Sequence, residues 1–314
     1  MLLLYRGEEF DANFYHRSGV DIDHSFLLED GEKRTLFVSM MNESLARASF
    51  KGKTVASDDL LKALSGHIGR RKVLFDGASM SARMAKKIGR SCKLEDHSEE
   101  LLRSRAKKKP GEVSAIKKAV AVTKEILASL DLSAAKTEDD LKKQIMHLTF
   151  EHGAEPAFDP IVATGKNTAY PHYRSGKKKL SDIVLVDYGV RYRHYCADLT
   201  RCIVLDADQK KKKQYEELQD ICMTLVDSLP NCKTGADLSK LSGKLMNWAG
   251  FPKMIHSIGH GIGLDVHELP SFGMRSKDPL AGCTLAMEPA FYKKSYGMRY
   301  EETVYFDGKK AKIL

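Results

Sequence analysis

Two aspartates beside apolar segments could supply half of a metal site. Asp187 ends one apolar segment, and Asp198 shortly precedes the next. They are eleven positions apart, so a hairpin that turns at Tyr192 and Arg193 would place their carboxylates opposite each other. Opposed residues on antiparallel strands have Cβ atoms about 4.5–5.5 Å apart, which is close enough to share metal ions. The competing interpretation is a pair of ordinary strand-end or turn aspartates.

A second acidic pair has the same kind of spacing. Glu288 follows the core-like segment 284–287, and Glu301 comes thirteen positions later. This odd separation also suits a hairpin whose two strands place the carboxylates opposite each other. On spacing alone, Glu302 could be the metal ligand instead of Glu301. Four acids in a partly buried site would raise one another's pKa values. A divalent metal ion is the usual remedy for such a cluster.

A histidine in a glycine-rich segment is the fifth candidate ligand. Glycines flank His260 on both sides, so another backbone or a metal ion can approach it closely. A second histidine, His267, follows seven positions later, and His172 lies in a loop-like segment rich in Gly, Asn and Pro. A lone histidine is more often structural, but the glycines and the second histidine favour a functional one here.

The combined ligand set predicts a particular class of metal and reaction. Four carboxylates and one imidazole suit Mn²⁺, Fe²⁺, Co²⁺ or Zn²⁺ better than copper, and they do not form a thiolate site. Two ions about 3.5–4 Å apart would activate a shared water and polarise a carbonyl group. We therefore predict a hydrolase with two divalent metal ions.

The order Asp, Asp, His, Glu, Glu resembles that of the pita-bread metallopeptidases, which include methionine aminopeptidase, aminopeptidase P and prolidase. The resemblance is greatest to archaeal-type Xaa-Pro dipeptidases and covers nearly the whole chain. Segments 13–15 and 18–20 resemble the start of a creatinase-type N-terminal domain, and 160–172 resembles the family's substrate-side histidine loop. This resemblance implies an α+β protein in which an N-terminal creatinase-type α/β domain precedes a C-terminal pita-bread catalytic domain.

The resemblance also implies how the metal ions are held. One ion would be held by Asp198, His260 and Glu301. The other would be held by Asp187 together with Asp198. Glu288 would bridge or ligate the ions and accept a proton from the attacking water.

Other residues match substrate-side positions of the family. His172 and His267 would lie near the substrate and stabilise the tetrahedral oxyanion. Tyr292 and Arg299 match positions that contact the substrate or support the metal site. A dipeptidase must also recognise the carboxylate of the terminal proline, for which Arg299 and Arg275 are candidates. Tyr173 replaces the glycine that usually follows the histidine, which leaves the pocket shape open.

The surrounding segments predict two domains, 1–110 and 111–314. The first contains strand-like segments at 25–28, 35–38 and 72–75 and a helix at 79–88, with a turn at Asp30 and Gly31. A basic stretch ending in Pro110 and Gly111 indicates the boundary.

The second domain should contain helices and a mostly antiparallel sheet. Helices are expected at 112–130, 211–229 and 236–249, and strands at 183–186 and 202–205. A further helix begins after Thr137, which with Asp140 forms a capping box, and ends at Gly153.

Composition limits the location and the partners. No apolar run among the 314 residues approaches the roughly 20 needed to cross a bilayer, and segment 1–5 is too short for a secretory signal. None of the six cysteines forms a C-x-x-C pair, so they read as reduced thiols, and we expect a cytoplasmic protein without a membrane partner. The net charge of +9 would suit a nucleic acid, but no aromatic residues interleave with the lysine clusters. A lysine-rich solvated surface is therefore favoured, without a specific nucleic-acid partner.

These observations predict a metal-dependent Xaa-Pro dipeptidase. Aminopeptidase P, which acts on longer Xaa-Pro peptides, is the alternative. A non-catalytic pita-bread binding module is less favoured, because such modules usually lose metal ligands and all five are present here. Mn²⁺ or Co²⁺ is the favoured metal, with Zn²⁺ or Fe²⁺ as alternatives. The resemblance also implies a homodimer, in which one subunit's N-terminal domain can cap its neighbour's site.

Overall fold

The chain divides into two units, Met1–Arg105 and Ala106–Leu314, in a computed structural model that describes residues 1–205 and 207–314. The division after Arg105 falls within the basic stretch that ends in Pro110 and Gly111. Both residues belong to the first turn of helix α6 (Pro110–Ala128), where proline's fixed φ suits a helix and its missing N–H is not needed. The assignment of 1–110 and 111–314 as domains stays a prediction.

The first unit is a mixed sheet with helices, as expected for an α/β arrangement. Its strands lie in the order β4-β3-β2-β1-β5-β6, with antiparallel pairing in β1-β2-β3 and parallel pairing elsewhere. The strands predicted at 25–28, 35–38 and 72–75 are confirmed as β2, β3 and β5. The bounds are β1 (Leu2–Arg6), α1 (Ala12–Ser18), β2 (Ser25–Asp30), β3 (Lys33–Val38), η1 (Met40–Asn42), α2 (Glu43–Ser49), β4 (Lys53–Ala56), α3 (Leu60–Ile68), β5 (Lys72–Phe75), α4 (Ala82–Ile88), β6 (Lys93–Asp96) and α5 (Ser98–Ala106).

The second unit combines helices with small sheets, and every pairing among its described strands is antiparallel, as predicted. The larger sheets run β12-β9-β8 and β14-β13-β15-β18-β19. The bounds after α6 are α7 (Glu138–Glu151), β7 (Glu155–Pro156), β8 (Ile161–Thr164), η2 (Gly165–Ala169), β9 (Ile183–Tyr188), β10 (Val190–Tyr192), β11 (Tyr195–Cys196), β12 (Leu199–Val204), α8 (Gln209–Ser228), η3 (Leu229–Asn231), α9 (Gly235–Trp248), β13 (Gly259–Gly261), β14 (Glu268–Ser271), β15 (Cys283–Met287), β16 (Ala290–Tyr292), β17 (Gly297–Arg299), β18 (Glu302–Phe306) and β19 (Ala311–Ile313).

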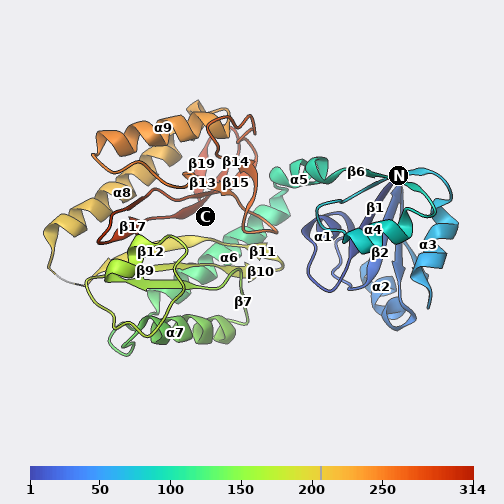
Figure 1. Ribbon diagram of the computed structural model, residues 1–314, viewed down its shortest axis with the longest axis horizontal. Coiled ribbons are helices and arrows are strands. Elements are labelled where there is room, and N and C mark those ends of the chain that lie inside the picture. Colours follow the sequence, from blue (N-terminus) through green and yellow to red (C-terminus); the bar gives the residue numbers. More distant parts are fainter. Residues whose placement is uncertain (206) are drawn as a thin grey trace. The chain divides into compact units, whose positions relative to one another are not determined.

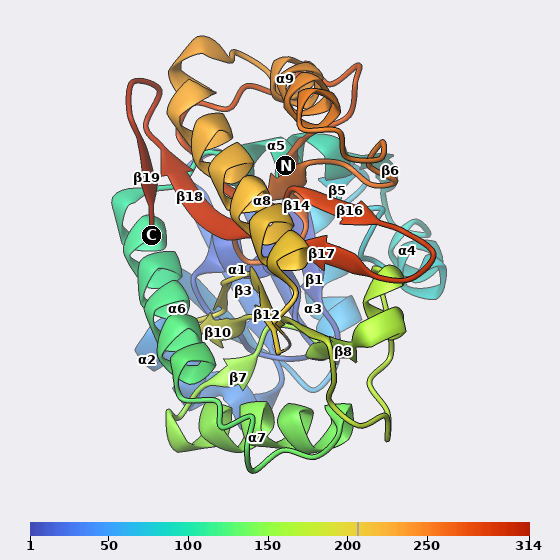
Figure 2. The same ribbon diagram turned by 90° about the vertical axis from the view of Figure 1, so that its left-hand side faces the viewer.

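Two helix pairs cover the sheets of the second unit. One apolar cluster joins α6 and α7 to β9 and its neighbours and contains Ile116, Leu141 and Val184. Another joins α8 and α9 to β15 and its neighbours and contains Leu225 and Leu285. Figure 1 shows the strands lying between these helix pairs, and Figure 2 shows α8 running across them. Each fully buried leucine or isoleucine contributes roughly 1.5–3 kcal/mol, so the helices hold the strands rigidly around the site.

The capping box predicted at the start of α7 is confirmed. The Thr137 hydroxyl accepts a hydrogen bond from the Asp140 N–H at 3.2 Å, and Asp140 accepts one from the Thr137 N–H at 3.0 Å. This is the predicted capping box, which satisfies two otherwise unpaired N–H groups.

The remaining sequence expectations concern cysteines and membrane spans. All six cysteines are free and buried. Within residues 1–205 and 207–314, no helix has the length and apolar character needed to cross a bilayer.

Candidate metal centre

The predicted hairpin between the two aspartates exists, but the predicted register is wrong. Asp187 lies opposite Thr200 instead of Asp198. The turn falls one residue later than predicted, at Arg193 and His194, whose φ angles are +48° and +67°. Such left-handed conformations suit a two-residue hairpin turn, but they are usually signalled by glycine or asparagine. Neither residue type is present at this turn.

A close approach of two strands still brings the aspartates into one cavity. A Cβ at Gly189 would collide with the carbonyl oxygen of Ala197, so the chain can pass there only with glycine. Asp187 lies two residues before Gly189 and Asp198 directly after Ala197. Both aspartates are buried, with 9% and 5% exposure respectively, and both line the same cavity.

The glutamate hairpin has the predicted register. The pairing of β15 with β18 places Glu288 opposite Glu301, and the pairing of β16 with β17 continues the same register beyond them. Both glutamates lie where the regular strand pairing is interrupted. They can therefore turn their side chains into the cavity that the aspartates line.

The surroundings of Glu301 and Glu302 differ. Glu301 lines the cavity and accepts a hydrogen bond from the Thr200 hydroxyl at 2.7 Å. Glu302 forms an ion pair with Arg201 and accepts a hydrogen bond from the Tyr300 hydroxyl at 2.7 Å, and it is not among the described residues that line the cavity. Of the two glutamates, only Glu301 lines the cavity, so it stays the candidate ligand.

His260 lies on the short strand β13, between β14 and β15. A Cβ at Gly259 or Gly261 would collide with a carbonyl oxygen of a neighbouring strand, which explains the glycines on either side. The His260 Nδ1 atom lies 3.0 Å from the Gly261 carbonyl oxygen, so Nδ1–H can donate to it. Nε2 then carries the free lone pair, 3.6 Å from Asp198 Oδ2 and 4.0 Å from Glu288 Oε1.

The structure brings all five predicted ligands to one cavity of about 510 Å³. Ligand atoms of Asp198, His260 and Glu301 lie within 4.8 Å of one another. The cavity is also lined by both predicted substrate-side histidines and by Arg299. The full set of predicted residues along this cavity is His172, Asp187, Asp198, His260, His267, Glu288, Arg299 and Glu301.

The electrostatics of the cavity favour a bound cation. Burial, and then the charge of Glu301, raises the pKa values of Asp198 and Glu288 well above their usual range. Burial and then Asp187 raise the pKa of Glu301 to about 7. The Oδ1 atoms of Asp187 and Asp198 are buried and accept no hydrogen bond from any described residue. These oxygens are therefore available to divalent ions, which would relieve the mutual repulsion of the carboxylates.

The protonation state of His260 also suits a metal ion. Burial, and then the neighbouring His267, lowers the pKa of His260 to about 4. The ring is therefore neutral at physiological pH, as a metal ligand must be. The residues present fit a divalent metal centre.

Arg299 supports the acidic cluster. It is 4% exposed, and it pairs with Asp187 and donates to Thr200 at 2.9 Å and to the Tyr292 hydroxyl at 2.8 Å. All three guanidinium nitrogens are thus engaged by protein acceptors. Tyr292 lies behind Arg299, outside the described lining of the cavity. Arg275 is exposed and is likewise outside that lining.

The cavity contains one histidine that the sequence reasoning missed. The His256 Nε2 atom lies 3.0 Å from the Tyr292 hydroxyl, and its Nδ1 atom lies 3.7 Å from Glu288 Oε2. His256 precedes His260 by four residues, so a count of histidines around the glycine-rich segment would have found it. His267 packs its ring 4.2 Å, between centroids, from that of His260. His172 is exposed at the edge of the cavity.

Tyr173 anchors the loop that carries His172. Its hydroxyl accepts a hydrogen bond from the Asn167 side chain at 2.7 Å. Asn167 also donates to Glu138, which is fully buried and accepts a second bond from the Thr164 N–H. Tyr173 is not among the described residues that line the cavity, so it shapes the pocket by holding the loop.

Comparisons with known proteins agree with this geometry. The sequence profile of metallopeptidase family M24 matches residues 114–307. An uncharacterised peptidase of Methanocaldococcus jannaschii is 34% identical over 203 residues, which are 61% of this chain and 58% of that protein. The Xaa-Pro dipeptidase of Pyrococcus furiosus is 28% identical over 96% of this chain and 90% of its own length. A recombinant prolidase of Thermococcus sibiricus has a similar structure, with a TM-score of 0.85, 27% identity, and coverage of 99% of this chain and 91% of that chain. The predicted α+β fold, with its pita-bread unit, is confirmed.

We expect the metal-free protein to bind Mn²⁺ more weakly as the pH falls. Glu301, with its pKa of about 7, takes up a proton below that pH, and the ion must displace the proton to bind. Each proton displaced lowers the apparent affinity by up to about ten-fold per pH unit below the pKa. Titration calorimetry between about pH 8 and pH 6 should show this slope. An affinity that does not change over this range would contradict the protonated state of the acidic cluster.

Proposed function

Because the chain belongs to metallopeptidase family M24, we propose that it hydrolyses Xaa-Pro dipeptides at a centre of two divalent metal ions. The observation that carries this proposal is the convergence of four carboxylates and a neutral imidazole on one cavity, where two buried carboxylate oxygens lack protein donors. The side chains proposed as ligands are Asp187, Asp198, His260, Glu288 and Glu301.

The ligands are proposed to divide between two positions. Asp198, His260 and Glu301 hold one ion, and the closeness of their ligand atoms supports this grouping. Asp187 shares Asp198 with the second position, and Glu288 bridges or ligates. When bound, the ions would lower the pKa of water and polarise the carbonyl group of the substrate.

Glu288 is proposed to handle the proton. Glu288 lines the metal cavity, so its carboxylate is placed to reach a water held there. It accepts the proton of the attacking water and can return it to the imino nitrogen of the departing proline. His256 lies beside this carboxylate, but its Nδ1 atom is 2.7 Å from the Ser257 carbonyl oxygen and its Nε2 atom is 3.0 Å from the Tyr292 hydroxyl.

The remaining lining of the cavity suits the substrate. His172 and His267 are both exposed at its edge and can donate hydrogen bonds to the oxyanion that forms during attack. Phe158, Ile161 and Val266 offer apolar contacts for a proline ring. An Xaa-Pro bond has no N–H to donate, so recognition must rest on the ring's shape and on the groups at either end.

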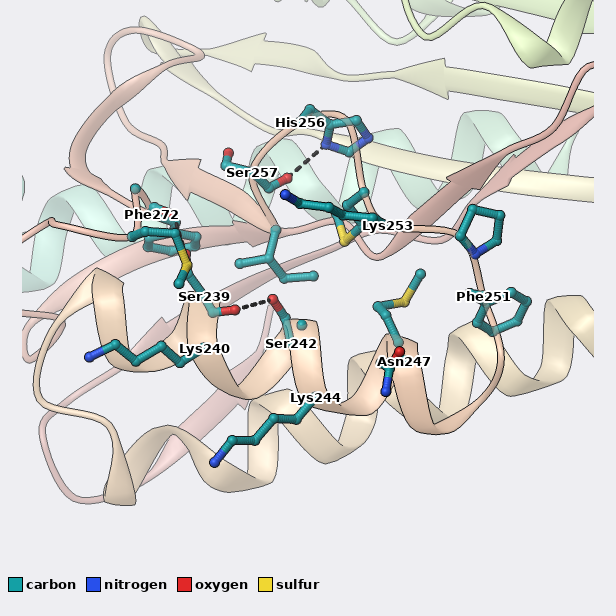
Figure 3. A pocket seen from close by; sticks show the side chains of 17 residues that line it. Ser239, Lys240, Ser242, Lys244, Asn247, Phe251, Lys253, His256, Ser257 and Phe272 are labelled. Carbon is teal, nitrogen blue, oxygen red and sulfur yellow. Dashed lines mark hydrogen bonds between the residues drawn. The ribbon is translucent and has the colours of Figure 1, made fainter.

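Aminopeptidase P activity is the second candidate. A further cavity, drawn in Figure 3, shares the lining residues His256 and Ser257 with the metal site, and its nearness is the observation that favours longer peptides. A binding module without catalysis is disfavoured, because all five ligand side chains converge on the cavity.

We also propose the metal, the location and the assembly. Mn²⁺ or Co²⁺ suits the mainly oxygen ligand set, with Zn²⁺ or Fe²⁺ as alternatives. Six free, buried cysteines support a reducing compartment such as the cytoplasm. The proposed homodimer and the supporting or substrate-side roles of Tyr292 and Arg299 follow from the family resemblance.

Chelation should abolish the hydrolysis of Met-Pro, and added Mn²⁺ or Co²⁺ should restore it. The reason is that the carboxylate cluster cannot by itself generate a nucleophile from water at neutral pH. Activity and metal content would be measured on the same samples. Full turnover by protein shown to be free of metal would refute the metal-dependent mechanism.

Substitution Glu288→Gln should lower kcat by at least about 10²-fold, because one side chain supplies both charge to the metal site and the proton-accepting group. Glu302→Gln is the matched control, since Glu302 is the neighbouring acid that does not line the cavity. The control should keep kcat within a few-fold of the original enzyme. Near-normal kcat in folded, metal-loaded Glu288→Gln would remove Glu288 from this role.

Amidation of the carboxyl end of Met-Pro should lower kcat/KM by about ten-fold or more. A dipeptidase recognises the free carboxylate of proline, and a charge-assisted hydrogen bond contributes about 1.5–3 kcal/mol. The comparison needs Met-Pro, its amide and Met-Pro-Ala under identical conditions. Equal cleavage of all three would exclude the dipeptidase and support aminopeptidase P.

A further inference from the structure

A buried ion pair lies close to the metal centre in sequence but outside its cavity. The ammonium group of Lys108 is 3.1 Å from Glu268 Oε1, and each side chain is 1% exposed. In the part of the chain that the structure describes, neither residue lines the metal cavity. Removing two charges from water is costly, so such a pair can serve to fix one conformation rather than to add stability.

Glu268 connects two histidines of the cavity through its backbone. It directly follows His267, the histidine proposed to stabilise the oxyanion. It is also the first residue of β14 and pairs with Gly261 on β13, next to the candidate ligand His260. The two histidine rings lie 4.2 Å apart between centroids. A displacement of Glu268 would therefore move His267 relative to the metal ligand.

The side chain of Glu268 packs against the segment that joins these histidines. A Cβ at Gly263 would lie 1.6 Å from Glu268 Oε1 and 2.8 Å from Lys108 Cε, so both side chains lie directly on this glycine. The Gly263 carbonyl oxygen accepts a hydrogen bond from the Cys196 N–H at 2.7 Å. The ion pair and this hydrogen bond together fix the path of the segment 262–267.

Lys108 is itself held by backbone groups. Its N–H donates to the Gly282 carbonyl oxygen at 2.8 Å, and its ammonium group donates to the Ala106 carbonyl oxygen at 3.0 Å. Gly282 directly precedes β15, which pairs with β13 on the side opposite β14. Lys108 therefore ties Glu268 to the strand that leads to Glu288.

His267 depends on this arrangement because its side chain is exposed at the edge of the cavity. An exposed side chain is not confined by packing on all sides, so its place is set largely by the backbone that carries it. Misplacing a catalytic group by about 1 Å can cost about 10²-fold in rate. A rigid backbone at His267 is thus a requirement of the chemistry proposed for it.

We propose that Lys108 and Glu268 are positioning residues that hold His267 in place for the reaction. This inference rests on the proposed function, because it assumes that His267 donates a hydrogen bond to the oxyanion. The pair acts through the backbone of His267 and does not reach the substrate. Its loss should lower kcat more than it changes KM, because the oxyanion forms only as the bond is attacked.

The test removes both charges in one variant, Lys108→Met with Glu268→Gln, because a single substitution would leave a buried charge without its partner. This pair variant should lower kcat for Met-Pro by about ten-fold or more, with KM within about three-fold of the original value. Adding His267→Ala distinguishes positioning from a general loss of structure. In that background the pair substitutions should change kcat by less than about two-fold, because the residue through which they act is gone.

Glu302→Gln is the matched control. Glu302 is a buried acid in an ion pair with Arg201, and it directly follows a candidate site residue, as Glu268 does. The control should keep kcat within a few-fold of the original enzyme, with and without His267→Ala. Glu268→Asp keeps the charge but shortens the side chain, so it replaces the pair variant if that variant does not fold, and it should show the same dependence on His267.

Hydrogen exchange of the segment 262–268 provides a readout without catalysis. Faster exchange there in the pair variant, but not in Glu302→Gln, supports the proposal. Unchanged exchange, near-normal kcat in the pair variant, or an equal loss of kcat with and without His267 would overturn it. Failure of the original enzyme to cleave Met-Pro would instead refute the proposed function, while the exchange comparison would still decide whether the pair holds the segment.

Discussion

Mutual repulsion among buried carboxylates is the constraint on which the catalytic unit depends. Four acids converge on one cavity, and burial raises the pKa values of Asp198, Glu288 and Glu301. Such a cluster is stable in its charged form only when nearby cations compensate it. The fold therefore has to hold the acids together against their own charge. It does so by packing two helix pairs on the strands that carry them.

Arg299 meets much of this requirement from within the protein. Its guanidinium pairs with Asp187, donates to Thr200 and donates to Tyr292, and Thr200 in turn donates to Glu301. A planar fork with several donors can satisfy three acceptors at once, which a lysine ammonium could not do in the same geometry. One side chain thus offsets part of the negative charge and links strand β17 to β9 and β12.

Charge is divided between two adjoining cavities. The metal site is lined by four acids, whereas the charged residues that line the cavity between helix α9 and segment 251–258 are Lys240, Lys244 and Lys253. His256 lies on the wall that both cavities share.

The sequence by itself determined the five candidate ligands, the glutamate hairpin and the capping box at Thr137, because these depend on residue type and local spacing. Spacing alone left Glu301 and Glu302 undecided, and in the folded chain only Glu301 lines the cavity. It misplaced the aspartate register, because the turn adopts left-handed φ angles at Arg193 and His194 without a glycine to indicate them. The cavity beside helix α9 and the contacts of Arg299 were decided by tertiary structure alone, because they join segments that are distant in sequence and meet only when the helices pack on the sheets.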